Sequence, residues 1–233
     1  MPLEILSWDE TPLGILCLRR RELASRPGTI VTEVTLDHEF LMSSYHTVSE
    51  EAMASEALER VDGDGLRVLV GGLGLGYTAQ AALRCERVIE VRVIELLPQV
   101  IAWLEDDQVP LAGELRDDAR LSVQQADVYA ELTSPGQECW DAILVDVDHS
   151  PDERLSGGMA TFYSKEGLRS AQTHLKPGGV LAVWSAADSE AFLGELQGVF
   201  DEAWHREITF HNDLVDLEQT DHLFLAKRPA HSE

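Results

Sequence analysis

The sequence is poor in cysteine, poor in basic residues and without long apolar runs. Its three cysteines are far apart and lack the paired spacing of a zinc site or a disulfide framework, which predicts structural thiols in a reducing compartment. The longest apolar runs, such as 68–70 and 142–145, are far shorter than the roughly 20 residues of a membrane span. No basic stretch followed by an apolar one is visible near the N-terminus, so we expect a cytoplasmic protein with no membrane partner.

The shortage of basic residues gives the chain a strong negative charge. Lys and Arg number 18 against 42 Asp and Glu, which leaves a net charge of −24. Such a chain repels a phosphate backbone, so nucleic acid is excluded as a partner. The same field would attract cationic ligands such as di- or polyamines, although an acidic surface can also be an adaptation for solubility or salt.

The chain divides into a short N-terminal region and a longer main domain. Its 233 residues, of which 44% are hydrophobic, are enough for one large core. Residues 14–20 and 30–36 read as strands of a small β-hairpin or meander, and 49–61 read as an amphipathic helix capped by Ser49. We therefore expect an N-terminal β-extension with a linking helix over residues 1–60 and one domain over residues 61–233.

In the main domain, predicted strands alternate with predicted helices. Residues 67–70 and 88–94 read as strands, each followed by a helical segment, which is the pattern of a βαβ unit and a parallel sheet. Further strands are expected at 121–124, 142–147 and 179–184, followed by an antiparallel pair at 207–211 and 222–226. The predicted fold is α/β, a Rossmann-like, doubly wound and mostly parallel sheet with an antiparallel edge pair.

A glycine-rich turn follows the first strand of this domain. Gly71, Gly72, Gly74 and Gly76 let the backbone pass close to a nucleotide-like ligand, although a tight structural turn would need glycine too. Glu95 ends the next strand, where a carboxylate can accept hydrogen bonds from ribose hydroxyls or simply face solvent. The glycine spacing differs from that of a dinucleotide-binding turn, so nicotinamide is disfavoured.

Acidic residues also follow the third and fourth strands of the predicted sheet. Asp127 could accept from an adenine amine or cap the helical segment 128–132. Asp146 and Asp148 would share a face at the carboxyl end of their strand, where they repel each other unless a cation or a proton intervenes. An amine acceptor would meet that need, and one carboxylate could deprotonate it; loop acids without a catalytic role are the alternative. His149 is a candidate base or a surface residue. A metal ion held by Asp146 and Asp148 is disfavoured, because no further cluster of ligands accompanies them.

Tyr45 and His46 lie between the N-terminal strands and the first helix. They could close over a ligand or serve in packing.

From residue 66 to 184 the chain resembles the spermidine synthase family of aminopropyltransferases and, more broadly, the class I S-adenosylmethionine-dependent methyltransferases. The resemblance rests on the turn at 71–76, on Glu95, Asp127 and Asp146, and on Phe162-Tyr163 followed by a helix and 175–179. It implies that Gly71, Gly72, Gly74, Gly76, Glu95, Asp127 and Asp146 bind S-adenosylmethionine or its decarboxylated form as co-substrate, without a metal. It also implies substrate contacts from Tyr45, His46 and Tyr163, and catalysis by Asp146 with Asp148 or His149.

The predicted function is therefore transfer of an aminopropyl group to a small amine, as in polyamine biosynthesis. Gly74 stands where that family usually carries an Asp for the donor's aminopropyl amine, and His149 stands where it carries a second Asp. These departures keep two alternatives open, a methyltransferase acting on a small molecule and a non-catalytic nucleoside-binding relative. Related transferases are often dimers, so a homodimer is possible by analogy.

Overall fold

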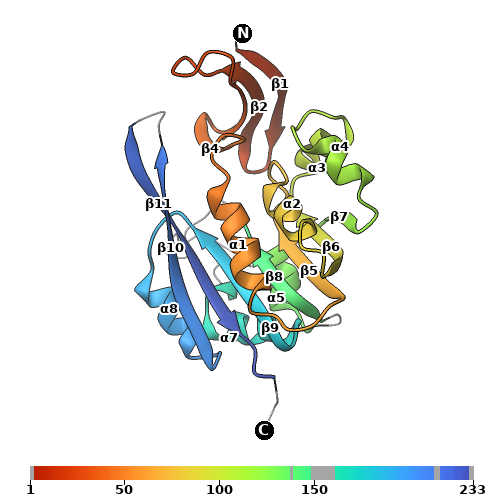
Figure 1. The fold of residues 1–233 in the computed structure, drawn as a ribbon, viewed down its shortest axis with the longest axis vertical. Helices are drawn as coiled ribbons and strands as arrows, with labels where there is room; N and C mark the ends of the chain where they lie inside the picture. The colour runs from red at the N-terminus through yellow and green to blue at the C-terminus, as the bar shows by residue number, and fades with distance from the viewer. Residues whose placement is uncertain (1–2, 137–138, 148–160, 213–215, 231–233) are drawn as a thin grey trace.

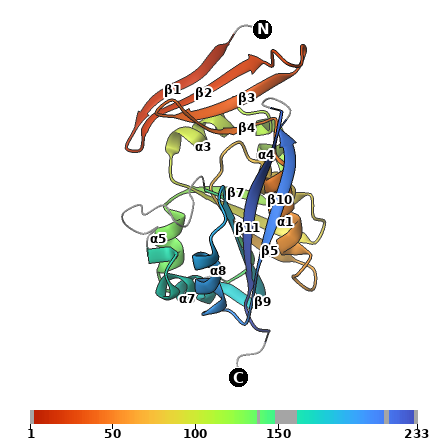
Figure 2. The same cartoon turned by 90° about the vertical axis from the view of Figure 1, so that its left-hand side faces the viewer.

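The N-terminal region forms a sheet of its own. The computed structural model describes residues 3–136, 139–147, 161–212 and 216–230. Four antiparallel strands follow one another in chain order, which confirms the expected meander; they are β1 (Glu4–Thr11), β2 (Gly14–Glu22), β3 (Ile30–Leu36) and β4 (Glu39–Ser43). This sheet lies across the end of the molecule opposite the C-terminus (Figure 2).

The main sheet has the order β10-β11-β9-β8-β5-β6-β7 (Figure 1). Its parallel strands are β5 (Leu66–Gly71), β6 (Val88–Glu95), β7 (Leu121–Gln125), β8 (Trp140–Val145) and β9 (Leu175–Ser185). The antiparallel strands β10 (Glu202–Asn212) and β11 (Leu217–Lys227) form one end of the sheet, with β10 at the edge and β11 between β10 and β9. The structure thus confirms the Rossmann-like α/β fold. Because the strand order reverses between β5 and β8, the loops after these two strands diverge and leave room for a ligand.

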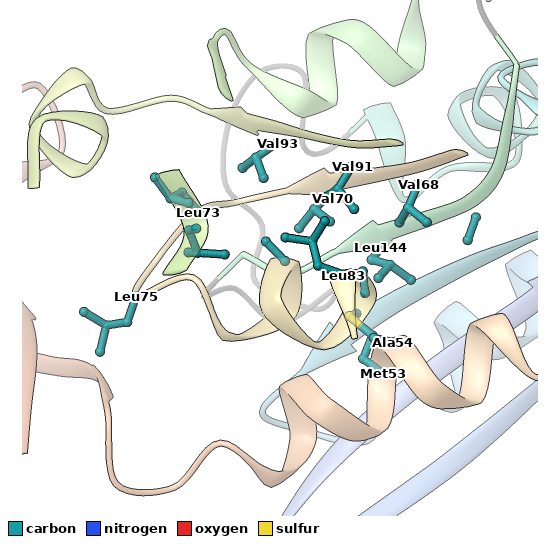
Figure 3. Packing of buried hydrophobic residues seen from close by; sticks show 14 of the residues in the cluster. Met53, Ala54, Val68, Val70, Leu73, Leu75, Leu83, Val91, Val93 and Leu144 are labelled. Carbon is teal, nitrogen blue, oxygen red and sulfur yellow. The ribbon is translucent and has the colours of Figure 1, made fainter. Parts of the chain in front are cut away.

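Helices cover both faces of the main sheet. On one side are α1 (Val48–Leu58), α2 (Tyr77–Leu83), α3 (Pro98–Glu105) and α4 (Ala112–Asp117), and on the other are α5 (Val128–Thr133), α7 (Lys165–Thr173) and α8 (Glu190–Gln197). The pleat of β5 sends Val68 and Val70 to the first side, where they meet Met53 of α1 and Leu83 of α2 (Figure 3). Leu69 joins the second core on the opposite side. Burial on both faces explains why β5 is a continuous apolar run.

The expected cap of the first helix is wrong. Helix α1 begins at Val48 after Thr47, which makes no side-chain capping bond. Ser49 is instead buried inside the first turn, and its hydroxyl donates to Oε2 of Glu50 at 3.1 Å. A short side chain at the second helical position can pack inward in this way.

No helix in the described part of the chain is long and apolar enough to cross a membrane. The longest of them, α1, has 11 residues.

Candidate functional site

A cavity of about 1170 Å³ lies between the N-terminal sheet and the carboxyl ends of the parallel strands. Its floor is made by the turn after β5 and by the ends of β6 and β8, and its roof by β2, β3 and β4. Strand β11 and the start of α1 contribute one wall. This is the place where open α/β sheets bind their ligands, and the volume is ample for a nucleoside with a second small molecule.

The glycine-rich turn is a tight turn at the edge of the cavity, and its contact with a nucleotide-like ligand stays a prediction. Gly72 has a φ of 97°, and a Cβ there would overlap the carbonyl oxygen of Asp146. Gly76 has a φ of 93°, and a Cβ there would overlap Leu115. These two glycines, together with Gly74, line the cavity. Gly71 lies beneath the turn, where an added Cβ would meet Cγ2 of Val128 at 2.6 Å, so its contribution is close packing.

Glu95 is buried at the end of β6 and faces the cavity. Its Oε2 accepts from the backbone N–H of Leu73 at 2.9 Å, and its Oε1 accepts from that of Leu97 at 2.7 Å. Burial raises the pKa of this carboxyl, although the backbone N–H groups oppose the shift. Glu95 is therefore not a solvated strand-end acid, since it holds the glycine-rich turn while facing the ligand space. Its contact with a ribose stays a prediction.

Asp127 caps α5 and also borders the cavity. Its Oδ1 accepts from the backbone N–H groups of Tyr129 at 2.9 Å and Ala130 at 3.3 Å. The cap is thereby confirmed. A contact between Asp127 and an adenine amine stays a prediction, which its position beside the cavity allows.

Asp146 lies just past β8, at the centre of the floor. Its backbone N–H donates to the carbonyl of Gly71 at 2.8 Å, and its Oδ2 accepts a hydrogen bond from the hydroxyl of Thr78. Burial raises the pKa of Asp146 to about 6; the bond from Thr78 opposes this shift, and the nearby Asp221 adds to it. An acid with this pKa can accept a proton near neutral pH.

Two further acids face the same cavity near Asp146 and were missed from the sequence. They are Glu50, in the first turn of α1, and Asp221, on β11. Burial, together with the charges of Asp146 and Asp221, raises the pKa of Glu50 to about 8. The available signal for Asp221 was alternation along its strand, since Leu223, two residues on, packs in the core on the side of α1. Glu50 had no such signal, because it is one of four glutamates between residues 50 and 59 and their spacing does not single it out.

Three carboxyl groups thus converge from three separate elements, α1, β8 and β11. Their mutual repulsion and burial favour protonation of Glu50 at neutral pH. A bound cation would instead favour loss of the proton from Glu50, because its positive charge stabilises the ionised carboxylates. The cluster is therefore suited to a cationic ligand.

The roof of the cavity has the opposite charge. Glu33 on β3 is 2% exposed and pairs with Nε of Arg19 at 2.8 Å and with Nη2 of Arg21 at 2.6 Å. Burial opposes ionisation of Glu33, but Arg21 and Arg19 outweigh it and lower the pKa of this carboxyl. One carboxylate and two guanidinium groups leave one net positive charge in an otherwise acidic cavity.

The predicted substrate-contact residues lie at different depths. His46 lines the cavity, and its Nε2 is 3.1 Å from Oδ1 of Asn212. Tyr45 packs its ring edge-on against His46, with centroids 4.6 Å apart, and is not among the residues that line the cavity. Tyr163 also lies behind the lining, with its hydroxyl 3.1 Å from that of Tyr129, which does face the cavity.

Asp148 and His149 lie outside the described residues. Their catalytic roles stay predictions.

Solved structures with the same fold include spermidine synthases and a methyltransferase-like protein. A spermidine synthase from Thermotoga maritima matches 98% of this chain and 74% of its own length, with a TM-score of 0.75 and 14% identity. A spermidine synthase in complex with the transition-state analogue AdoDATO matches 98% and 75%, with a TM-score of 0.74 and 14% identity. Human methyltransferase-like protein 13, in complex with SAH, matches 80% and 83%, with a TM-score of 0.55 and 24% identity. No protein-family model matches the chain.

The chain therefore has the fold of the spermidine synthases and class I methyltransferases. The two spermidine synthases match almost the whole chain, the four-stranded N-terminal sheet included.

Proposed function

We propose that this protein transfers an aminopropyl group from decarboxylated S-adenosylmethionine to a small amine. The observation that carries the proposal is the convergence of Glu50, Asp146 and Asp221 on one cavity. An amine acceptor is cationic at neutral pH, and these carboxyl groups would hold it against the floor. The fold, shared with spermidine synthases, supports the same activity by analogy.

The donor would lie over the glycine-rich turn. Glu95 would accept from the ribose hydroxyls, and Asp127 would accept from the adenine amine; both face the cavity. Gly72, Gly74 and Gly76 have positive φ angles, which favour glycine, and their lack of side chains leaves the backbone of the turn open to a ligand. The sulfonium would then approach Asp146, where the acceptor is bound.

The reaction is a direct displacement in which the protein aligns two small molecules. Asp146 takes a proton from the acceptor ammonium, and the neutral nitrogen attacks the carbon bonded to sulfur. A nitrogen–carbon bond forms while the carbon–sulfur bond breaks, and its electron pair goes to sulfur. The products are a secondary ammonium and a neutral thioether nucleoside. Glu50 and Asp221 orient the acceptor, with Asp148 or His149 as additional candidates for the proton transfer.

A methyltransferase is the second candidate, because two observations concern the end of the donor that carries its amine and, in intact S-adenosylmethionine, its carboxylate. Gly74 stands where the aminopropyltransferases carry an Asp for the donor amine, and a Cβ there would lie 2.9 Å from Sδ of Met42. The net positive charge of Arg19, Arg21 and Glu33 lies in the same cavity. Intact S-adenosylmethionine carries a carboxylate that this charge would attract, whereas the decarboxylated donor does not.

Product analysis distinguishes these candidates. Purified protein is incubated with either donor and a panel of diamines, and the products are identified by mass spectrometry. We expect methylthioadenosine and an aminopropylated diamine, formed only from the decarboxylated donor. S-adenosylhomocysteine and a methylated acceptor would replace this proposal by the methyltransferase, and no product with any pair would favour the non-catalytic relative.

A further inference from the structure

A second cluster of ionisable side chains lies on the opposite face of the main sheet from Asp221. It consists of Asp188, between β9 and α8, His205 on β10 and His222 on β11. His222 follows Asp221 directly, so the pleat of β11 turns the two side chains to opposite faces. The ring of His205 stacks on Phe224 at 4.9 Å, and Phe224 belongs to the core on the side of α8.

One ligand atom from each of these three side chains lies within 4.8 Å of the others. Nε2 of His205 is 2.9 Å from Nδ1 of His222, and Nδ1 of His205 is 3.8 Å from Oδ1 of Asp188. With metal–nitrogen bonds of about 2.0–2.1 Å, two nitrogens on one ion are roughly 3 Å apart. The two imidazole nitrogens that lie 2.9 Å apart therefore have the spacing of neighbouring ligands on a single ion. The 3.8 Å contact of Asp188 is to the other nitrogen of His205, so its carboxylate would have to turn toward the pair to complete a three-ligand set.

We propose that Asp188, His205 and His222 form a binding site for a divalent transition-metal ion, with Zn²⁺ the best match. Two imidazoles and one carboxylate suit Zn²⁺, Ni²⁺ and Cu²⁺, whereas Mg²⁺ and Ca²⁺ prefer all-oxygen sites. Three protein ligands leave at least one coordination position for water or another small ligand. The His205 side chain is 18% exposed and that of Asp188 is 51% exposed, so an ion could enter from solvent without unfolding the sheet.

A bound ion would cross-link separate elements at this edge of the sheet. Asp188 belongs to the loop before α8, whereas the two histidines belong to the paired strands β10 and β11. One ion would therefore connect the loop to the edge pair and stabilise both. The site shares no residue with the lining of the cavity, so it is independent of the proposed transferase activity.

Direct titration tests the site. Tag-free protein is treated with a chelator, exchanged into metal-free buffer and titrated with Zn²⁺ by calorimetry, with Mg²⁺ as a second titrant. We expect one equivalent of Zn²⁺ to bind with a micromolar or tighter Kd, a higher Tm in Zn²⁺ and no heat from Mg²⁺. His205→Gln and His222→Gln should each weaken Zn²⁺ binding by at least about tenfold.

His211→Gln is the matched control, because His211 lies on the same strand and pairs with Asp216 outside the cluster. Circular dichroism of each variant checks that it has folded. Co²⁺ gives a second readout, since a visible absorption band reports its histidine-bound environment. Failure of the wild-type protein to bind Zn²⁺ would overturn the site, as would unchanged Zn²⁺ affinity in a folded double variant of His205 and His222.

Discussion

We expect Asp146→Asn to lower kcat for the proposed group transfer by about 10²–10⁴-fold, the usual contribution of a positioned general base. Asp146 lies on the cavity floor with a pKa of about 6, so it is ionised and able to accept the acceptor's proton at neutral pH. In the wild-type protein kcat/KM should rise with pH through about 6 and then level off, because kcat/KM reports the protein without substrate and the base form of Asp146 appears above its pKa. Asparagine removes this rising limb while keeping nearly the same shape.

Asp141→Asn is the matched control for this experiment. Asp141 lies near the start of the same strand, accepts from the backbone N–H of Arg67 at 2.7 Å and pairs with Nζ of Lys176 at 2.7 Å. It is absent from the cavity lining, so its variant should keep the wild-type kcat and pH profile. Steady-state kinetics across pH 5 to 9 make the comparison. An Asp146→Asn variant with wild-type kcat would remove Asp146 from the mechanism.

Gly72→Ala should lower the free energy of unfolding by about 2–5 kcal/mol. The backbone at Gly72 has a φ of 97°, which alanine adopts only with strain. The new methyl group would also overlap the Asp146 carbonyl oxygen, which belongs to rigid backbone rather than to a flexible side chain. Both effects force the turn and the end of β8 apart, so donor binding should weaken as well.

Urea denaturation measures the loss, with Gly113→Ala as the control. Gly113 lies inside α4, and an added Cβ there has nothing within 4 Å. Alanine at that position should be neutral or stabilise the protein by up to about 1 kcal/mol, because it favours the helix. Equal unfolding free energies for Gly72→Ala and the wild-type protein would show that position 72 does not require glycine.

The main sheet was predictable because its strands carry a strong local signal. Strand β5 is a continuous apolar run, and a parallel strand buried on both faces requires one. Strands β1 and β4 were missed for the opposite reason. Exposed and polar residues dominate β1, and β4 is only five residues long, so neither carries a clear alternation. Pairing with β2 and β3 defines these strands, and that contact is not visible in local sequence.

The candidate-site residues that follow parallel strands were predictable from the sequence, and those on other elements were not. Glu95, Asp127 and Asp146 each follow a parallel strand, and the carboxyl ends of such strands share one edge. Glu50 comes from α1 and Asp221 from the antiparallel strand β11, more than a hundred residues apart in sequence. Their meeting depends on tertiary packing. Sequence therefore indicated the part of the cavity at the strand ends better than the part formed by α1 and β11.

Binding of the donor is the most direct test of the account. Decarboxylated S-adenosylmethionine and S-adenosylmethionine are titrated by calorimetry, at matched salt, into the wild-type protein and into Glu95→Ala. The account predicts that the decarboxylated donor binds more tightly, and that Glu95→Ala weakens its binding by at least about tenfold, because a carboxylate hydrogen bond to the ribose is lost. If neither donor binds to the folded wild-type protein, the account is contradicted.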